Sequence, residues 1–247
     1  MEFIVHRLDN CPSTNDVARE MARAGAPEGT VVTADEQTAG RGTKGRAWHS
    51  ARGKGLYVSV ILRPRSASMA LLPLAAGLAA RDAVATVCGL EALLRWPNDL
   101  VVGGRKLGGI LCEAAFLGSL PEYAILGTGL NIYHEDGDFP AELRPAAISI
   151  SGAGGRPIER EALLAELLAQ TALRAAMLER GAPGAAELIA DFERHSEFRP
   201  GDPIEVLAGD ETVRGAYRGL DPDGALVIAG PSGVRRFAAA EISQVRI

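Results

Sequence analysis

A segment that combines glycines with cations limits what the chain can build around it. Residues 40–46 read Gly-Arg-Gly-Thr-Lys-Gly-Arg, and Trp48 follows shortly after. The segment has a flexible backbone and many hydrogen-bond donors, but no side chain suited to a core. Ordering each residue costs about 1–2 kcal/mol of backbone entropy, whereas a hydrogen bond to a charged group returns only about 1.5–3 kcal/mol. We therefore expect a loop that is mobile when empty and ordered when a phosphate or carboxylate binds.

Two familiar glycine motifs do not fit this segment. Residues 40–45 match the spacing of the dinucleotide-binding fingerprint, but that fingerprint lies between a strand and a helix. A strand-like stretch, Thr30 to Asp35, precedes the segment, whereas residues 48–55 cannot begin a helix. A phosphate-binding P-loop ends in Gly-Lys-Ser/Thr, which Gly45-Arg46-Ala47 does not supply. A solvated basic turn remains the alternative to a binding loop.

Composition indicates a globular protein with one large and one small domain. The chain has 247 residues, of which 47% are hydrophobic and 23% charged, with a net charge of −5. The basic loop is therefore a local patch, which argues against general nucleic-acid binding. Scattered cysteines without a CxxC pair indicate buried thiols in a reducing compartment, and the histidines lack zinc spacing. The longest apolar run, Met69 to Ala80, is too short for a bilayer, and no signal peptide opens the chain, so we expect a cytoplasmic protein without a membrane partner.

The first part of the chain alternates strands and helices. Ser13 precedes a helical pattern that ends near Gly25, and Ser13 with Asp16 resembles a helix N-terminal cap. Gly103-Gly104 is a two-residue hairpin signal. The other expected helices are about Ser68–Val87, Glu159–Glu179 and Ala185–His195, and the strands are Thr30–Asp35, Leu56–Leu62, Leu93–Trp96, Asp99–Val102, Arg105–Glu113 and Tyr123–Leu130.

The pattern changes at Arg199-Pro200-Gly201-Asp202. Short β-type runs separated by turn residues follow, which indicates a small barrel. We therefore expect an α+β fold with two domains, residues 1–198 and 199–247. The strands expected in the second domain are Ile204–Leu207, Thr212–Leu220, Ala225–Ile228, Val234–Phe237 and Ile242–Ile247.

Polar residues cluster at turns and strand ends close to the glycine loop. Gln37 leads into the loop, and Trp96-Pro97-Asn98-Asp99 forms a turn. The hairpin then brings Lys106 near Asn98 and Asp99. Gly127-Thr128-Gly129-Leu130-Asn131 closes a further strand with two glycines and an amide.

In order and approximate spacing, these motifs resemble those of the biotin protein ligases. The resemblance rests on Ser13-Thr14-Asn15, the glycine loop with Trp48, Trp96 to Asp99, Lys106-Leu107 with Gly109-Ile110-Leu111, and Gly127 to Asn131. It covers roughly residues 10 to 135 by motif. It implies an SH2-like mixed β-sheet catalytic domain with flanking helices, followed by an SH3-like β-barrel.

The resemblance also implies an ATP-dependent ligase. Biotin carboxylate attacks the α-phosphate of MgATP, which gives biotinyl-5′-adenylate and pyrophosphate. A lysine of a biotin carboxyl carrier domain, the protein partner, then takes the biotinyl group and releases AMP. Biotin, ATP and Mg2+ are the small molecules that this chemistry needs.

Site roles follow from the resemblance. Lys106 would bridge the biotin carboxylate and the α-phosphate, and Arg41 would close over the ligand with the backbone of Gly42 and Thr43. A snorkelling strand lysine and an exposed loop arginine are the alternatives. The set implied to bind biotin or the adenylate is Ser13, Thr14, Asn15, Gln37, Arg41, Gly42, Thr43, Lys106, Gly109 and Gly129.

The polar members of this set suit the ureido ring of biotin, which offers donors and an acceptor without charge. Ser13 as a plain helix cap, and Gly109 and Gly129 as ordinary strand glycines, remain alternatives. For ATP and its adenine the resemblance points to Lys44, Arg46, Trp48, Asn98 and Asn131. Asp99 would hold magnesium or orient the incoming amine; a structural turn role for Asp99 and Asn98, and core packing for Trp48, stay open.

The chain departs from the family pattern in two places. Thr43 stands where the best-known loop has a second arginine, so we expect Lys44 or Arg46 to compensate and to retain the adenylate. The residues before Ser13 leave no room for the DNA-binding domain of some members, so we expect no DNA partner.

Three alternative functions remain to be weighed. The first is a lipoate or octanoate ligase-transferase, which would share the fold. The second is a biotin-binding module without catalysis, and Arg41 and Lys106 argue against it. The third is RNA binding by residues 200–247, which lack a concentrated basic surface. A homodimer, the carboxylases modified, the biotin affinity and the role of the C-terminal barrel are left open by the sequence.

Overall fold

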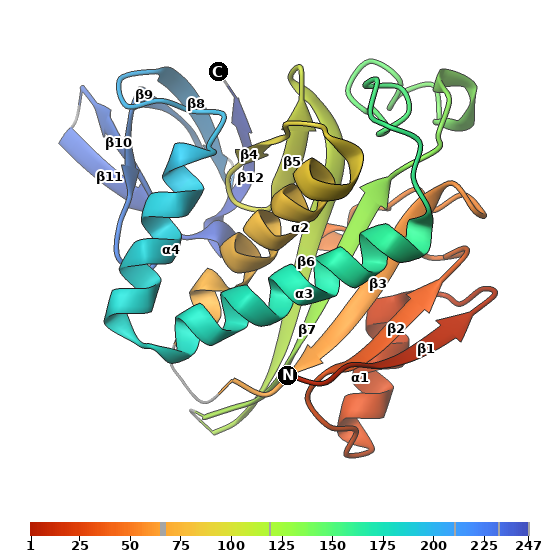
Figure 1. Cartoon of the computed structure of the whole chain (residues 1–247). Coiled ribbons are helices and arrows are strands. Elements are labelled where there is room, and N and C mark those ends of the chain that lie inside the picture. Colours follow the sequence, from red (N-terminus) through yellow and green to blue (C-terminus); the bar gives the residue numbers. More distant parts are fainter. Residues whose placement is uncertain (65–67, 119, 210, 232, 247) are drawn as a thin grey trace.

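A seven-stranded mixed sheet forms the larger part of the molecule, and a five-stranded antiparallel sheet forms the smaller part (Figure 1). The computed structural model describes residues 1–64, 68–118, 120–209, 211–231 and 233–246. Its α-helices are α1 (Thr14–Arg23), α2 (Leu72–Cys88), α3 (Arg160–Glu179) and α4 (Ala182–Arg194). Its strands are β1 (Ile4–Leu8), β2 (Thr30–Ala34), β3 (Gly55–Leu62), β4 (Leu93–Arg95), β5 (Asp99–Val102), β6 (Arg105–Leu117), β7 (Leu120–Asn131), β8 (Pro203–Ala208), β9 (Glu211–Leu220), β10 (Leu226–Gly230), β11 (Gly233–Phe237) and β12 (Ile242–Arg246).

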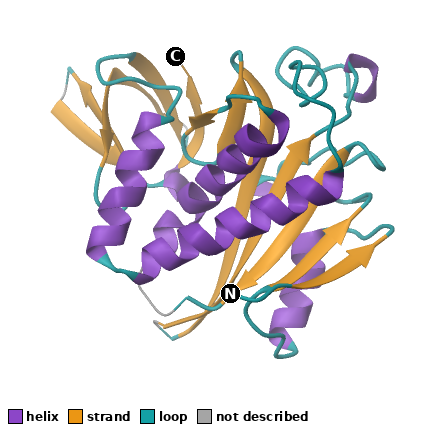
Figure 2. Cartoon of the chain, viewed as in Figure 1, coloured by secondary structure: helices purple, strands orange, loops and turns teal. Residues whose placement is uncertain are grey.

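The large sheet is covered on both faces. Its strand order is β1-β2-β3-β7-β6-β5-β4, with only β1 and β2 parallel to each other. Helices α2, α3 and α4 lie on one face and α1 on the other (Figures 1 and 2). Side chains therefore alternate between two cores, because Val31 and Val60 join the three-helix layer while Val32 and Ile61 pack under α1. Strand β3 is buried along its whole length for this reason.

Helix α2 explains the longest apolar stretch of the sequence. Together with the preceding 3-10 turn, the helical segment Met69–Cys88 is long and apolar enough, by length and composition alone, to cross a membrane. The uninterrupted apolar run named from the sequence, Met69 to Ala80, is the first part of this helical segment, which continues through Arg81 and Asp82. In this fold 67% of the most apolar 18-residue window of the segment is buried, and Leu78, Ala79, Ala80 and Ala83 are fully covered. The composition is that of a core helix, whose alanines let α3 pack closely.

The small sheet shares a core with the large one. Its order is β11-β10-β9-β8-β12, and its apolar side chains belong to the same cluster as the three-helix layer. The buried indole of Trp96 donates to the carbonyl of Gly224 at 2.9 Å, and the rings of Phe198 and Tyr217 lie 5.9 Å apart. The α+β class is confirmed, as is the run of short strands after residue 199; Ile247, the expected end of the last strand, lies outside the described residues. Strand β6 is longer than expected and continues to Leu117.

A buried arginine connects α2, α3 and α4, the three helices that lie on the same face of the large sheet. Arg174 of α3 donates to Asp191 of α4 at 2.5 Å and also pairs with Asp82 of α2. Burial on its own would raise the pKa of Asp191, but the hydrogen bond and charge of Arg174 hold that pKa below its ordinary value. The ion pairs therefore depend on Asp191 being ionised.

We expect Arg174→Met to lower the free energy of unfolding by about 2–4 kcal/mol, because Asp191 is buried and both carboxylates lose the cation that joins them, keeping Arg194 and Arg81 as ion-pair partners. The matched control is Arg7→Met, which removes the exposed Arg7–Glu161 pair and should change stability little. A depressed carboxyl pKa contributes stability above the unfolded value of about 3.9, and this contribution disappears as pH falls through the folded value. The difference between wild type and Arg174→Met in urea unfolding should therefore shrink in acid. An unchanged unfolding midpoint at neutral pH would contradict the assignment.

Candidate functional site

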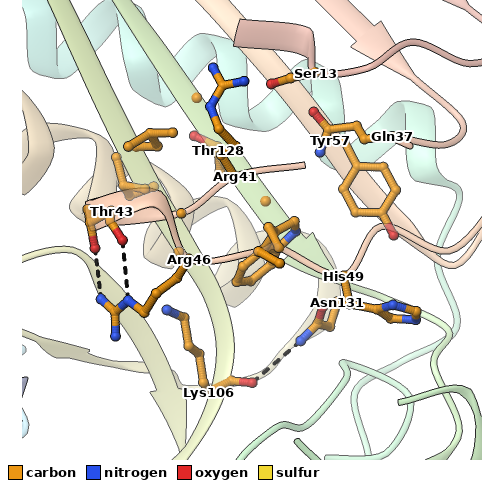
Figure 3. A pocket seen from close by; sticks show the side chains of 18 of the residues that line it. Ser13, Gln37, Arg41, Thr43, Arg46, His49, Tyr57, Lys106, Thr128 and Asn131 are labelled. Carbon is orange, nitrogen blue, oxygen red and sulfur yellow. Dashed lines mark hydrogen bonds between the residues drawn. The ribbon is translucent and has the colours of Figure 1, made fainter. Parts of the chain in front are cut away.

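A cavity of about 250 Å³ opens on the face of the large sheet that carries α1. The start of α1, the glycine loop, strands β3, β6 and β7, and the segment 139–147 surround it (Figure 3). Of the residues named from the sequence, those that line the cavity are Ser13, Thr14, Asn15, Gln37, Arg41, Gly42, Thr43, Arg46, Trp48, Asn98, Lys106, Gly109, Gly129 and Asn131.

Glycines in paired strands make the floor of the cavity. Gly129 of β7 lies between Gly109 of β6 and Tyr57 of β3 in the ladder, and Gly127 occupies the next row on the same face. A Cβ on Gly129 would stand 2.7 Å from Nε1 of Trp48, and one on Gly127 would stand 2.2 Å from Oδ1 of Asn15. Gly129 therefore allows Trp48 to lie close to the sheet, because a side chain there would fill the space that the indole occupies.

Hydrogen-bonding side chains form one end of the cavity. Gln37 Oε1 accepts from the backbone of Thr14 at 2.8 Å, and Ser59 Oγ lies 2.8 Å from the hydroxyl of Thr14 and 2.6 Å from Oδ1 of Asn15. Ser13 occupies the N-cap position of α1, but its side chain makes no capping hydrogen bond. The helix-cap role for this hydroxyl is therefore not observed, and Ser13 lies buried against the cavity instead.

Each of two cations on the cavity wall is paired with a carboxylate outside the lining. Arg41 donates through both terminal nitrogens to Asp16 of α1, at 2.5 and 2.6 Å. Lys106 Nζ lies 2.6 Å from Asp99 Oδ1 and 5.4 Å from the ring centroid of Trp48. The hydrogen bond from Arg41 lowers the pKa of Asp16, and the same bond raises the pKa of Arg41. The ion pairs thus hold the two side chains in place, and both cationic side chains line the cavity while their aspartate partners do not.

The glycine loop is a short closed hairpin. The backbone N–H of Gly42 donates to the carbonyl of Arg46 at 2.7 Å, and the guanidinium of Arg46 donates to Oγ1 of Thr43 at 2.8 Å (Figure 3). Lys44 at the tip has φ +57° and is not among the lining residues. As expected, residues 48–54 form no helix after the loop.

Two asparagines brace the backbone around Lys106. Asn98 donates to the carbonyl of Ile110 at 2.7 Å, and Asn131 donates to the carbonyl of Ile148 at 3.1 Å. The Asn98 side chain thus bonds across to strand β6 rather than within its own turn, and both asparagine side chains line the cavity. The backbone of Lys106 also bonds Ala146 and Ile148, which brings the segment 139–147 to the cavity rim.

Several lining residues were missed by the sequence analysis. Thr128 lies within the recognised motif Gly127 to Asn131 but was given no role there, His49 follows Trp48 directly, and Tyr57 and Val58 lie on a strand that was predicted without a site role. Phe139, Leu143, Ala146 and Ala147 lie in an irregular segment that no motif marks. The remaining lining residues are Ala47, Ile110, Leu111 and Gly127.

Buried nitrogen atoms without partners lie in and beside the cavity. Nε1 of Trp48 and Nε2 of His49 have none, and neither do the two ring nitrogens of His134. Burial lowers the pKa of His134 to about 4, so its imidazole is neutral at physiological pH. His134 stacks on Phe139 with ring centroids 4.7 Å apart. Trp48 therefore presents an aromatic face to the cavity, while its Nε1–H lies buried over Gly129.

The described residues do not form a metal centre of their own. No group of three or more histidine, cysteine, aspartate or glutamate side chains in that part of the chain has metal-binding geometry. Asp99, the one candidate ligand named from the sequence, is engaged by Lys106 and does not line the cavity.

The cavity therefore suits a ligand that is polar and neutral at one end and anionic elsewhere. Hydroxyls and amides stand at the start of α1, an indole covers the glycine floor, and cations line the wall. Such an arrangement can bring two anionic groups together and neutralise both.

Comparison with known proteins assigns the family. The model of the biotin/lipoate A/B protein ligase family matches residues 8–131, and the model of the biotin protein ligase C-terminal domain matches residues 201–244. The biotin--[acetyl-CoA-carboxylase] ligase of Paracoccus denitrificans is 32% identical, covering 95% of this chain and 98% of its own. The bifunctional ligase/repressor BirA of Bacillus subtilis is 32% identical, over 95% of this chain and 72% of its own length.

Solved structures agree with the sequence matches. The biotin protein ligase of Aquifex aeolicus, in complex with biotin and ATP, superposes with a TM-score of 0.84 at 26% identity and covers 98% of each chain. The ligase of Leishmania major in complex with biotinyl-5-AMP gives a TM-score of 0.67 at 26% identity, over 97% of this chain and all of its own. With two family models in order along the sequence and relatives aligned over nearly its full length, the chain belongs to the biotin/lipoate A/B protein ligase family.

Proposed function

We infer that the chain is a biotin protein ligase, which activates biotin with ATP and transfers it to a protein. The relatives are named as biotin ligases, and the matching structures hold biotin with ATP or biotinyl-5-AMP. One observation carries the assignment to this cavity: Lys106, Arg41 and Trp48 share it with the polar residues at the start of α1.

The first half-reaction joins two anions. A carboxylate oxygen of biotin attacks the α-phosphorus of ATP, the bond to the pyrophosphate oxygen breaks, and biotinyl-5′-adenylate forms. Lys106 and Arg41 reduce the repulsion between carboxylate and phosphate and hold both in line, which is the main catalytic need in such a transfer. The pairs with Asp99 and Asp16 orient the two cations before substrate arrives.

The second half-reaction uses the adenylate as an acyl donor. A lysine amine of a carrier domain attacks the acyl carbon, an amide bond forms, and AMP leaves with the electron pair of the broken C–O bond. The family implies a biotin carboxyl carrier protein as the acceptor. The cavity must therefore open toward a protein partner after the first step.

Biotin is proposed to lie with its ureido ring at the start of α1. Ser13, Thr14, Asn15 and Gln37 offer hydroxyl and amide groups there, and Ser59, which the sequence analysis missed, holds two of them in place. Trp48 covers the glycine floor formed by Gly109 and Gly129, so biotin is proposed to lie beside the indole rather than beneath it.

The nucleotide is proposed to lie toward the loop and the segment 139–147. Arg46 and the backbone of Gly42 and Thr43 suit phosphates, and Trp48 suits a base. Asn98 and Asn131 support this side of the cavity by bracing its backbone. Lys44 lies at the tip of the loop and does not line the cavity, so no nucleotide contact is proposed for it.

Magnesium is proposed to arrive with ATP, held by phosphate oxygens and water. The residues here do not fit a metal ion held by protein side chains, because Asp99 is engaged by Lys106. We therefore propose that Asp99 orients Lys106.

The domain division is proposed at residues 1–198 and 199–247. The matched models support it, since they end at 131 and begin at 201. We further propose a cytoplasmic enzyme that acts without DNA or a membrane; the net charge of −5 and the burial of α2 support this.

Lys106→Met should reduce biotin-dependent exchange of labelled pyrophosphate into ATP by at least about a hundredfold, because it removes the bridging charge but keeps the stem over Trp48. The matched control is Lys54→Ala. Lys54 forms an ion pair with Asp138 at 2.8 Å and does not line the cavity, so exchange should persist. Equal losses in the two variants would overturn the role of Lys106.

Wild-type protein should catalyse pyrophosphate exchange with biotin but not with octanoate, because hydroxyls and amides at the start of α1 suit a ureido ring and give an alkyl chain nothing to bond. Exchange with octanoate alone would assign the protein to the lipoate relatives. Binding of biotin without exchange would indicate a module without catalysis.

Retention of the adenylate should depend on Arg46, which bonds Thr43 at the place where the family pattern has a second arginine. We expect Arg46→Gln to increase biotinylation of a bystander protein such as serum albumin, relative to carrier biotinylation in the same mixture, while wild type labels it little. Lys44→Gln is the control on the same loop. Equal bystander labelling by wild type and Arg46→Gln would show that Arg46 does not retain the intermediate.

A further inference from the structure

Asp16 on the first turn of α1 holds the arginine of the glycine loop. Its two carboxylate oxygens accept from the two terminal nitrogens of Arg41, at 2.5 and 2.6 Å, which is a two-point ion pair with defined orientation. Arg41 lines the cavity and Asp16 does not. The carboxylate therefore stands behind the guanidinium, on the side away from the cavity.

The pair belongs to a balanced charge network. Arg19 lies 2.8 Å from Asp16 and 2.7 Å from Glu113 of β6, and Glu113 Oε1 lies 3.9 Å from Arg41. The second oxygen of Glu113 accepts from Nδ2 of Asn15 at 2.7 Å. Two arginines thus meet two carboxylates, and the same network holds an amide of the polar end of the cavity.

The geometry leaves Arg41 able to bind a second anion. A guanidinium has five N–H donors, of which the bonds to Asp16 use two. Nε–H takes no part in that pair. A carboxylate or phosphate in the cavity can therefore bind Arg41 without displacing Asp16.

We propose that Asp16 is a positioning residue for biotin activation, which fixes the Arg41 guanidinium at the cavity wall and keeps the glycine loop folded against α1. The proposal rests on the proposed function for its kinetic part. The sequence suggested only a helix-capping role for Asp16, and the structure shows its carboxylate bonded to side chains instead. A competing role, in which Asp16 blocks Arg41 until substrate displaces it, predicts the opposite change in substrate affinity.

The first test is independent of activity. Trypsin cuts after Arg41, Lys44 and Arg46, so the rate of cleavage within residues 41–47 reports how long the loop stays folded. Asp16→Asn should increase the cleavage rate about tenfold in protein without ligand, because it removes the charge that holds Arg41. Glu161→Gln, which removes the exposed Arg7–Glu161 pair, is the control and should leave the rate unchanged. Equal cleavage of wild type and Asp16→Asn would overturn the proposal even if the ligase function failed.

The second test is kinetic. In pyrophosphate exchange, Asp16→Asn should raise the KM for biotin about tenfold, and Asp16→Glu should restore part of the loss. In an Arg41→Ala background, Asp16→Asn should have no further effect, because Asp16 acts through Arg41. A lower KM in Asp16→Asn would show that the carboxylate competes with substrate, and additive losses in the double variant would show a general structural role; either result overturns the proposal. Absence of exchange in wild type would count against the proposed function alone.

Discussion

The cavity depends on how closely Trp48 can approach the sheet. An indole can lie on a β-sheet only where the residues beneath it have no side chains, and here Gly129 and Gly109 provide that surface. The ladder aligns them across β6 and β7, so a shift of β7 by one residue would place Leu130 in this row and close the site. The pairing of these strands is therefore a condition for binding as well as for folding.

Arg41 and Lys106 are held at the cavity in the same way. Arg41 and Lys106 each face the cavity, and each is bound by an aspartate that does not line it. A cation at a cavity wall without such a partner would be mobile, and a buried anion within the cavity would repel substrate. An aspartate behind each cation fixes its direction and leaves further N–H donors for the ligand. One pair joins the loop to α1 through Arg41 and Asp16, and the other lies on the sheet between Lys106 and Asp99. The positions of both cations around the reacting groups are therefore fixed.

Much of this could be predicted from the sequence. Short motifs at turns, such as residues 40–46 and the Gly103-Gly104 hairpin, located most of the cavity lining, because turn residues and strand glycines have few other uses. The segment 139–147 could not be found in this way. It reaches the cavity through backbone bonds to Lys106, and such bonds place no demand on side-chain identity. Asp16 was also missed as a partner of Arg41, because a carboxylate on the first turn of a helix is common for helix-dipole reasons alone.

The ion pair between Arg41 and Asp16 changes the explanation of how the glycine loop becomes ordered. Considered alone, its glycines and cations suggested that only an incoming anion would order it. The protein supplies an anion of its own in Asp16, placed at the end of α1 where the helix N-terminus also favours negative charge. Ordering of the loop by substrate is then a smaller step, since the Arg41 end of the loop is already attached to α1. Less of the binding free energy of substrate is spent on folding the loop, so more of it remains for bringing carboxylate and phosphate together.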